Sequence, residues 1–482
     1  MYDVVIIGAG STGAFIAREL SKYKINVLVI EKNNDVGFET SMANSAIIHS
    51  GYDPKPGTLK AKLNVRGNSL YDEICKDLDV EFKRIGSLTL AFNDEQISIL
   101  QQLKERAKAN DVKVKIIDDK EEIIKLEPNI NRNVKAVLFA ESAGIIDPFN
   151  LVVHAFENAC DNGVKLVLNE EVKSIIIKDN IYHISTNKQL YTTKIVINAA
   201  GLYADNIANM IEQIDFNIVP RKGQYYILDH FKDGYINHVL FPLPSEKGKG
   251  VLVSPTTSGN YIIGPSSELV SLKDDISTDS LTLKHIKENA LLLVDNIPMN
   301  ESIRVFAGLR ATPSTHDFFI NHSKKYKTFI NVAGIESPGL ASAPAIGEYI
   351  VNELVKPILP LEKKLNFNPK VRKYIKTSKL TSKELEELIK KDSSYGKIIC
   401  SCEKVSLGEL LDCLNRSVPP RSIKSVKKRI RMGFGKCQGG FCQPQVLLTL
   451  KKFYHLDMLD IVYDNENSEI LLKKIKEKIN EN

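Results

Sequence analysis

Apolar residues at the start of the chain are grouped in a way that predicts a strand, a helix and a second strand. The first strand covers Val4 to Ile7, a short run rich in β-branched residues, as in strands buried on both faces of a parallel sheet. A helix is expected from Ala14 to Ser21 and a second strand from Asn26 to Ile30. This order within about thirty residues is typical of a βαβ unit.

The same periodicity places further elements along the chain. Val80 to Phe92 predicts a pair of strands, and Asp94 to Ala109 has the apolar spacing of an amphipathic helix. Residues 219–229 and the stretch from Phe241 alternate apolar and polar positions between Gly and Pro turns. Such alternation indicates a mixed or antiparallel sheet.

Length and composition describe an ordinary globular protein of two or three domains. The chain has 482 residues, 43% of them hydrophobic and 26% charged, with a formal net charge of +6. No apolar run reaches the roughly eighteen residues of a membrane span, and the start resembles neither a signal nor a transit peptide. We therefore expect a cytoplasmic protein without a transmembrane segment, although peripheral membrane contact stays open. No basic stripe with interleaved aromatic residues indicates a nucleic-acid partner.

Three glycines mark the turn after the first strand as a nucleotide site. Gly8, Gly10 and Gly13 form G-x-G-x-x-G, which allows a tight turn, a close approach to a pyrophosphate, and close packing of helix on sheet. Glu31 ends the second strand, where a carboxylate accepts hydrogen bonds from a ribose diol. Because strand, turn, helix, strand and acid occur in this order, a dinucleotide is the predicted ligand.

A family resemblance follows this unit. The segment SAIIHSGYDPKPGTLKAKLNVRG, residues 45–67, is similar to the flavin-contacting segment of the glycine oxidase and D-amino-acid oxidase superfamily. Within it, L-2-hydroxyglutarate dehydrogenases and anaerobic glycerol-3-phosphate dehydrogenase-type proteins resemble this chain. The resemblance implies that the dinucleotide is FAD and that the segment carrying His49 passes the flavin ring. It also places small polar residues along the pyrophosphate and ribityl chain: Thr40, Ser41, Asn44 and Ser45.

Two later stretches resemble further parts of this flavin site. Ile195 to Asn198 predicts a buried strand running to Gly201, where glycine lets the backbone approach the cofactor. In relatives, the backbone near Val172 contacts adenine. A simple edge hairpin explains the sequence around Val172 equally well.

The stretch from Phe329 to Leu354 is expected to complete the FAD site. A strand reaches Gly334, and a helix begins near Ala341. Free N–H groups and the dipole at a helix N-terminus favour an anion. The resemblance places Gly339 and Leu340 beside the flavin, where this end of the helix stabilises the reduced cofactor.

Candidate catalytic and substrate-binding residues combine this resemblance with side-chain chemistry. Relatives often have an arginine at the position of Arg310, expected after a Gly308–Leu309 turn, that binds an anionic group in bidentate fashion; a surface ion pair is the alternative. His49 is the candidate base because imidazole titrates near neutral pH, although a contact to the cofactor explains it equally well. Weaker candidates for substrate contact are Arg221, Lys222 and Tyr225.

Four of the seven cysteines form two close pairs near the C-terminus, Cys400-x-Cys402 and Cys437-x₄-Cys442, with glycines around the second. Paired thiolates on glycine-rich loops suit a [2Fe–2S] cluster, whereas zinc and reactive thiols are the alternatives. Residues 396–450 resemble the domain of bacterioferritin-associated ferredoxin. Two arginines beside the second pair, Arg429 and Arg431, either offset cluster charge or form a solvated basic face. The remaining cysteines are expected in cores: Cys75, Cys160 and Cys413.

These features together predict an α/β fold with three parts. A Rossmann-like FAD-binding domain covers residues 1–80, 141–215 and 325–368, and a mixed-sheet α+β substrate domain covers 81–140 and 216–324. A small helical [2Fe–2S]-binding domain covers residues 396–450. Residues 369–395 are predicted to be a linker with a charged helix at Thr381 to Lys391, and residues 451–482 a charged helical tail.

The two predicted cofactors favour a dehydrogenase over an oxygen-using oxidase. A flavin takes two electrons as hydride, whereas a [2Fe–2S] cluster passes one at a time. The domain order resembles proteins that oxidise sn-glycerol 3-phosphate to dihydroxyacetone phosphate, which is the first prediction for a small anionic substrate. An L-2-hydroxy acid dehydrogenase, an amino-acid dehydrogenase and a non-catalytic electron-transfer subunit are the alternatives. No second glycine fingerprint for NAD is visible, so a second redox subunit or a quinone is the expected electron acceptor.

Overall fold

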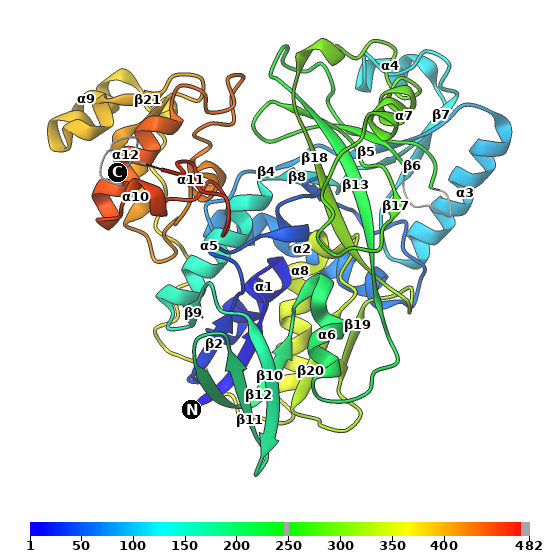
Figure 1. Cartoon of the computed structure of the whole chain (residues 1–482). Coiled ribbons are helices and arrows are strands. Elements are labelled where there is room, and N and C mark those ends of the chain that lie inside the picture. Colours follow the sequence, from blue (N-terminus) through cyan, green and yellow to red (C-terminus); the bar gives the residue numbers. More distant parts are fainter. Residues whose placement is uncertain (245–249, 474–482) are drawn as a thin grey trace, which may run out of the picture.

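A parallel sheet with the strand order of a dinucleotide-binding fold forms the base of the molecule (Figure 1). The computed structural model describes residues 1–244 and 250–473. Five parallel strands lie in the spatial order β9 (Lys165–Val167), β2 (Val27–Ile30), β1 (Tyr2–Ile7), β12 (Leu190–Asn198) and β20 (Phe329–Ala333). Antiparallel strands extend this sheet at its edge: β10 (Val172–Lys178), β11 (Ile181–Thr186) and β19 (Phe319–His322). β19 belongs to this sheet although it lies before residue 325, the predicted start of the last segment of the FAD-binding domain.

Both faces of the parallel sheet are covered, as the apolar run in β1 predicts. Val4 and Ile6 face one core, whereas Val5 and Ile7 face the other, because successive strand residues point to opposite sides. The first core is shared with α1 (Ser11–Leu20), α2 (Leu59–Asp77), α5 (Pro148–Asp161), α8 (Gly339–Tyr349) and the π-helical stretch η4 (Ile350–Val355). On the other face lie the β10–β11 hairpin, the short helix η2 (Gly201–Tyr203) and α6 (Ala204–Asn209).

A second, mostly antiparallel sheet forms the predicted substrate domain. Its strands are β5 (Ser87–Ala91), β6 (Lys115–Ile117), β7 (Ala136–Ala140), β13 (Ile218–Leu228), β14 (Val239–Phe241), β15 (Leu252–Pro255), β16 (Tyr261–Gly264), β17 (Glu268–Leu269) and β18 (Ser302–Pro313). The helices of this part are α3 (Asp94–Ala109), α4 (Lys120–Leu126), α7 (Ser280–Ala290) and η3 (Met299–Glu301). The long pair β13 and β18 reaches from this sheet to the core of the parallel sheet, so it joins the two layers.

The predicted pairing of two strands within residues 80–92 is wrong. β4 (Phe82–Arg84) joins a small sheet with β8 (Gly144–Ile146) and β3 (Ile47–Ile48), whereas β5 pairs with β7 and β14. Gly86 lies between them with a φ of +71°, and a Cβ there would lie 2.5 Å from the Phe139 ring. The turn at this glycine sends the chain from one sheet into another.

The C-terminal cysteines lie in a small, mainly helical part with its own core. Its elements are β21 (Ile398–Cys400), β22 (Val405–Ser406), α10 (Leu407–Leu414), α11 (Ile423–Ile430) and α12 (Gln443–Tyr454). Leu410, Val426 and Leu450 are buried together. In the predicted helical tail, α12 ends at Tyr454, and a short helix, η7 (Met458–Asp460), and a bridge between Val462 and Glu469 follow. The predicted tail residues 474–482 lie outside the described residues.

The predicted linker is a packed part of the interface between the C-terminal part and the parallel sheet. The ring of Tyr374 stacks on that of His154 in α5, with 5.0 Å between centroids, and the Arg416 guanidinium lies 3.7 Å from the Tyr374 ring. Arg416 also forms a buried ion pair with Glu157 at 2.9 Å. η5 (Thr377–Lys379), α9 (Ser382–Lys391) with its cap Thr381, and η6 (Ser393–Gly396) complete this segment.

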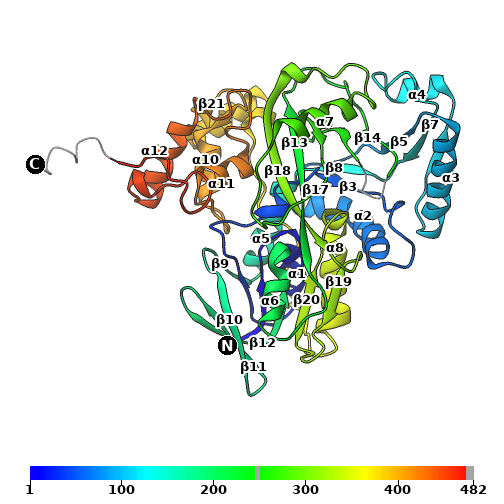
Figure 2. The ribbon, with the colours of Figure 1, turned by 45° about the vertical axis from the view of Figure 1, so that its right-hand side comes forward.

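A second buried contact joins α11 to the loop after β2. The Asp35 carboxylate accepts from both terminal nitrogens of Arg429, at 2.7 and 2.8 Å, and lies 3.0 Å from the Lys428 Nζ. Figure 2 shows the C-terminal part at the upper left, beside the second sheet and above α5 and β9. Within the described ranges, none of the helices is both long and apolar enough to cross a bilayer.

Candidate active site

The turn between β1 and α1 leaves no room for side chains at two of its glycines. A Cβ at Gly8, whose φ is +108°, would lie 2.4 Å from the Ala199 carbonyl oxygen. A Cβ at Gly13 would lie 2.1 Å from the carbonyl oxygen of Gly8. Gly10 lines a central cavity together with the first residues of α1. The N–H groups at this helix end favour a pyrophosphate there.

Glu31 lies at the end of β2 and is held by three hydrogen bonds. Its Oε2 accepts from the Ala9 N–H at 2.7 Å, and its Oε1 accepts from the N–H and the side-chain amide of Asn33 at 2.9 and 2.8 Å. Burial raises the pKa of Glu31, while these N–H donors oppose the shift. The carboxylate is therefore fixed beside the glycine turn, as a ribose-binding acid requires.

A cavity of about 790 Å³ lies between the two large sheets. Its wall comes from the start of α1, the loop of residues 40–49 with the short helix η1 (Glu39–Ser41), the strands β13 and β18, and residues 335–340. The structure gathers most predicted site residues in this wall: Gly10, Thr40, Ser41, Asn44, Ser45, His49, Gly201, Arg310, Gly339 and Leu340.

The remaining predicted residues lie behind the wall. Gly8 and Gly13 belong to the turn described above, Glu31 lies beside it at the end of β2, and Val172 belongs to the same buried core as Ile30. Gly334 has a φ of +66° and turns the chain after β20, close to Pro313.

The loop that carries the small polar residues crosses β18 at a glycine. A Cβ at Gly308 would lie 2.2 Å from the Ala43 carbonyl oxygen, and the Thr40 hydroxyl donates to the Leu309 carbonyl at 2.6 Å. Gly308 and Leu309 lie inside β18, so the predicted turn before Arg310 is wrong. The glycine serves close approach of the loop instead of chain reversal.

His49 lies just after β3, on the cavity wall. Its backbone carbonyl accepts from the side-chain amides of Asn64 and Asn68 at 2.7 and 3.0 Å, and its ring lies 5.8 Å from that of Phe241. Across the cavity wall, the Tyr225 hydroxyl lies 3.3 Å from the Ser45 Oγ. The two amides of α2 thus fix the backbone that presents the imidazole.

Two arginines face the cavity from neighbouring strands. Arg221 in β13 is directly opposite Arg310 in β18, and both line the cavity. Arg310 donates to the Ser266 carbonyl at 3.3 Å and Arg221 to the Ser267 hydroxyl at 3.2 Å. Within the described residues neither arginine forms an ion pair with a carboxylate. Adjacent guanidinium groups without an ion-paired carboxylate favour an anion at this wall.

Lys222 points away from the cavity. Its Nζ lies 2.9 Å from Asp275 and 3.3 Å from the Ser277 hydroxyl. Alternation along β13 places neighbouring side chains on opposite faces, so this weaker candidate does not join the arginines.

The N-terminus of α8 closes the cavity. Pro338, Gly339 and Leu340 line it, and the dipole of this helix favours negative charge there. Glu336, which the sequence analysis did not single out, also lines the wall. Its carboxylate is held by the Lys60 Nζ at 2.7 Å and the Thr312 hydroxyl at 2.9 Å. No local sequence pattern distinguishes this glutamate from a surface residue.

The four C-terminal cysteines meet as two sulfur pairs. The Sγ atoms of Cys402 and Cys437 are 3.7 Å apart. Burial raises the pKa of Cys437, but N–H groups of the following residues and the Cys402 thiol outweigh it, so the pKa is lowered. Burial and the neighbouring Cys400 raise the pKa of Cys442 to about 12. No group of three or more His, Cys, Asp or Glu side chains suited to one metal ion is found in residues 1–244 and 250–473.

The loop around these sulfurs fits an iron–sulfur cluster. Backbone N–H groups of Gly439, Gly440 and Phe441 help to lower the pKa of the Cys437 thiol, and N–H groups near thiolates also suit a cluster. A Cβ at Gly435 would lie 2.5 Å from the Cys402 Cβ, so glycine lets the two halves close. Of the two nearby arginines, Arg429 is fully buried on Asp35 and forms no basic surface.

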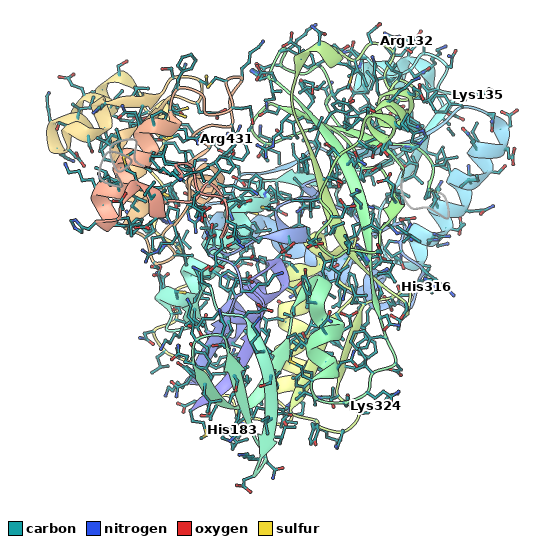
Figure 3. All side chains as sticks on the ribbon, viewed as in Figure 1. Arg132, Lys135, His183, His316, Lys324 and Arg431 are labelled. Atoms are coloured by element: carbon teal, nitrogen blue, oxygen red, sulfur yellow. The ribbon has the colours of Figure 1, made fainter. Side chains whose placement is uncertain are left out.

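Arg431 lies where the C-terminal part meets the rest of the molecule (Figure 3). It forms an ion pair with Glu403 at 2.8 Å and donates to the Asn260 side chain at 3.2 Å. The cysteine loop is therefore anchored next to the second sheet.

Comparison with known proteins agrees with this arrangement. The sequence profile of the FAD dependent oxidoreductase family matches residues 3–353. The chain belongs to this family. The profile of the BFD-like [2Fe–2S] binding domain matches residues 398–452, which contain all four paired cysteines. The predicted cofactors, FAD and a [2Fe–2S] cluster, and the oxidoreductase class are thereby confirmed, and the α/β fold is confirmed as well.

Three relatives differ in how much of this chain they match. A glycerol 3-phosphate dehydrogenase from Caloramator mitchellensis is 48% identical over 479 residues, covering 99% of this chain and 100% of its own. A structure of L-α-glycerophosphate oxidase from Mycoplasma pneumoniae with FAD bound is 34% identical, with a TM-score of 0.73, and covers 77% of this chain and 98% of its own. A mitochondrial L-2-hydroxyglutarate dehydrogenase from Arabidopsis thaliana is 30% identical over 73% of this chain and 83% of its own.

Proposed function

We propose that the protein oxidises sn-glycerol 3-phosphate to dihydroxyacetone phosphate by hydride transfer to FAD, and that the electrons leave through the [2Fe–2S] cluster. The observation that carries this proposal is the pair of arginines, Arg221 and Arg310, facing the cavity without carboxylate partners among the described residues. The end-to-end similarity to a glycerol 3-phosphate dehydrogenase supports the same substrate.

The spacing of the arginines favours phosphate over a dicarboxylate. Opposite residues on neighbouring antiparallel strands have Cα atoms about 5 Å apart, so two guanidinium groups can converge on one compact dianion. A phosphate group carries nearly two negative charges on one centre. In 2-hydroxyglutarate the second carboxylate lies at the far end of the carbon chain, so one of its ends would need another cation.

The other cavity residues have roles consistent with removal of hydrogen from a secondary alcohol. When bound, FAD supplies the two-electron acceptor, and the [2Fe–2S] cluster supplies one-electron transfer. With the phosphate on the arginines, His49 accepts the hydroxyl proton as the carbonyl forms. The N-terminus of α8, at Gly339 and Leu340, favours negative charge on its side of the cavity.

The C-terminal part distinguishes this protein from the Mycoplasma oxidase. The match covers 98% of that oxidase's chain but only 77% of this one. We therefore assign electron exit to the cluster and not to oxygen. A second redox subunit or a quinone is the proposed acceptor.

The deciding experiment is an anaerobic titration of the purified holoenzyme, following flavin absorbance near roughly 450 nm. Bleaching by glycerol 3-phosphate supports the proposal. Bleaching only by L-2-hydroxyglutarate, or only by an amino acid, would replace the substrate. If none of these bleaches the flavin, the chain is an electron-transfer subunit.

A further inference from the structure

The helix that follows the cysteine loop exposes a stripe with an apolar beginning and a basic end. Phe441 is 86% exposed and Leu448 is 48% exposed, with Pro444 exposed between them. The stripe continues to Lys451 and Lys452, which are also exposed. From Pro444 to Lys452 this is the three- and four-residue spacing of one helix face, and Phe441 lies in the turn just before α12. We name these five residues the α12 face.

The opposite side of α12 holds the C-terminal part together. Val446, Leu447 and Leu450 are buried in its core. The exposed apolar residues therefore do not contribute to that core, and folding alone does not account for them. An exposed phenylalanine in such a position is typical of a contact residue.

The apolar beginning of the α12 face adjoins the sulfurs. Phe441 lies between Cys437 and Cys442 in the chain. Cys402, 3.7 Å from Cys437, is itself exposed. A protein resting on Phe441 would therefore lie directly against the cysteine site.

The basic end lies about 11 Å along the helix from Pro444, given the rise of 1.5 Å per residue. In the described part of the chain, no ion pair joins a carboxylate to Lys451 or Lys452. The chain segment 474–482 has three lysines and two glutamates, so its own charge does not complement them. Acidic side chains on a partner would complement these two lysines.

We propose that the α12 face is the docking site of an acidic one-electron carrier protein. This inference rests on the proposed function, because it identifies the partner that takes electrons from the [2Fe–2S] cluster. Each encounter oxidises the cluster by one electron and reduces the carrier by one, so two carriers are needed for each substrate oxidised. Weak, small interfaces of this kind suit electron carriers that must leave quickly.

A membrane surface fits the same face less well. Phe441, Pro444 and Leu448 make a narrow apolar strip, and two lysines at one end provide little attraction to anionic lipids. The position of Phe441 between two cluster cysteines favours a redox partner.

The test uses rubredoxin, a small acidic one-electron carrier, as the probe, and cytochrome c, which is basic, as its counterpart. Two variants of the holoenzyme are compared with wild type: Phe441→Ala and the double variant Lys451→Glu/Lys452→Glu. The matched control is Lys390→Glu/Lys391→Glu, an exposed pair at the end of α9. Each protein is reduced photochemically, so the test does not depend on the substrate, and rubredoxin binding is measured separately by titration calorimetry.

We expect both α12 variants to reduce rubredoxin about tenfold more slowly at low salt and to bind it more weakly, with cluster content and substrate bleaching of flavin unchanged. The charge variant should approach wild type at 1 M salt, where the screening length is about 3 Å, and should not slow cytochrome c reduction. If the α12 variants reduce rubredoxin as fast as the α9 control does, the proposed docking site is wrong. Binding of wild type, but not Phe441→Ala, to anionic lipid vesicles without any effect on rubredoxin would replace the carrier by a membrane. Failure of substrate bleaching alone would contradict the proposed function but not the docking site.

Discussion

One step along a strand separates an anion-binding cation from a structural one in the cavity wall. Arg221 faces the cavity opposite Arg310, whereas the next residue, Lys222, is bonded to Asp275 on the other side of the sheet. Residue type identified all three cations as candidates, but only the pairing of β13 with β18 decides which of them can share one anion.

Arg310→Ala should raise the KM for glycerol 3-phosphate by roughly 10- to 100-fold, because one charge-assisted contact contributes about 1.5–3 kcal/mol. Flavin content should not change, since the arginine lies on the substrate side of the wall. Steady-state kinetics with an artificial electron acceptor measures the effect. Lys222→Met is the matched control from the same strand, and its KM should stay within about twofold of wild type. A KM for Arg310→Ala equal to that of wild type would show that the phosphate binds elsewhere.

His49→Gln separates a base from a cofactor contact. A base contributes about 10²- to 10⁴-fold to the chemical step, so the rate of flavin bleaching at saturating substrate should fall by that amount. Glutamine keeps hydrogen-bonding ability, and the backbone of residue 49 stays fixed by Asn64 and Asn68, so FAD affinity should change little. The opposite result, weak FAD binding with a normal bleaching rate, would assign His49 to the cofactor.

At the scale of elements, the carboxylate predicted to hold ribose is supported from the far end of the chain. The Asn33 side chain donates to Glu31 at 2.8 Å and accepts from the Asn465 amide at 2.7 Å. The Asn34 side chain also donates to the Asp464 carbonyl at 2.7 Å. The segment after η7 therefore positions the loop that orients Glu31.

Asn465→Ala should weaken FAD binding by about fivefold, because it removes one hydrogen bond of roughly 1 kcal/mol from this relay. Asn465→Asp should weaken it at least as much, since a carboxylate cannot donate to Asn33. Glu466→Ala, an exposed neighbour, is the control. Fluorescence titration of the apoprotein with FAD measures the dissociation constant. Equal affinity in all four proteins would mean that Glu31 is positioned without the relay.

Elements with a local signal could be predicted closely, and contacts between distant segments could not. β1, α1 and β2 follow from periodicity and three glycines, and the first and third glycines are required by backbone contacts of 2.4 and 2.1 Å. The strands on either side of Gly86 were predicted to pair but enter different sheets, because pairing depends on partners elsewhere in the chain. The support of Glu31 by Asn465, more than 400 residues away, has no local pattern at all.

At the scale of the whole molecule, the C-terminal part is docked by buried contacts and not tethered by a free linker. The ion pairs Arg416–Glu157 and Arg429–Asp35 are both buried, at 2.9 and 2.7 Å. Removing one partner of such a pair typically costs about 3–5 kcal/mol, so the arrangement of the parts is specific. The cysteine site is thereby held at a fixed place relative to the FAD cavity, as transfer between two cofactors requires.

Cys437→Ser tests whether substrate oxidation and electron exit are separable. Serine keeps the size of the side chain but removes one thiolate of the pair with Cys402, so the purified protein should lose iron and sulfide. FAD should remain bound, because the cavity and Glu31 lie in the other parts. Glycerol 3-phosphate should still bleach the flavin in this variant, whereas rubredoxin reduction should fall to background.

Cys413→Ser, which replaces a buried cysteine outside the site, controls for general damage to this part of the fold. Retained iron and sulfide would contradict the ligand assignment, and normal rubredoxin reduction without a cluster would show that electrons leave directly from the flavin.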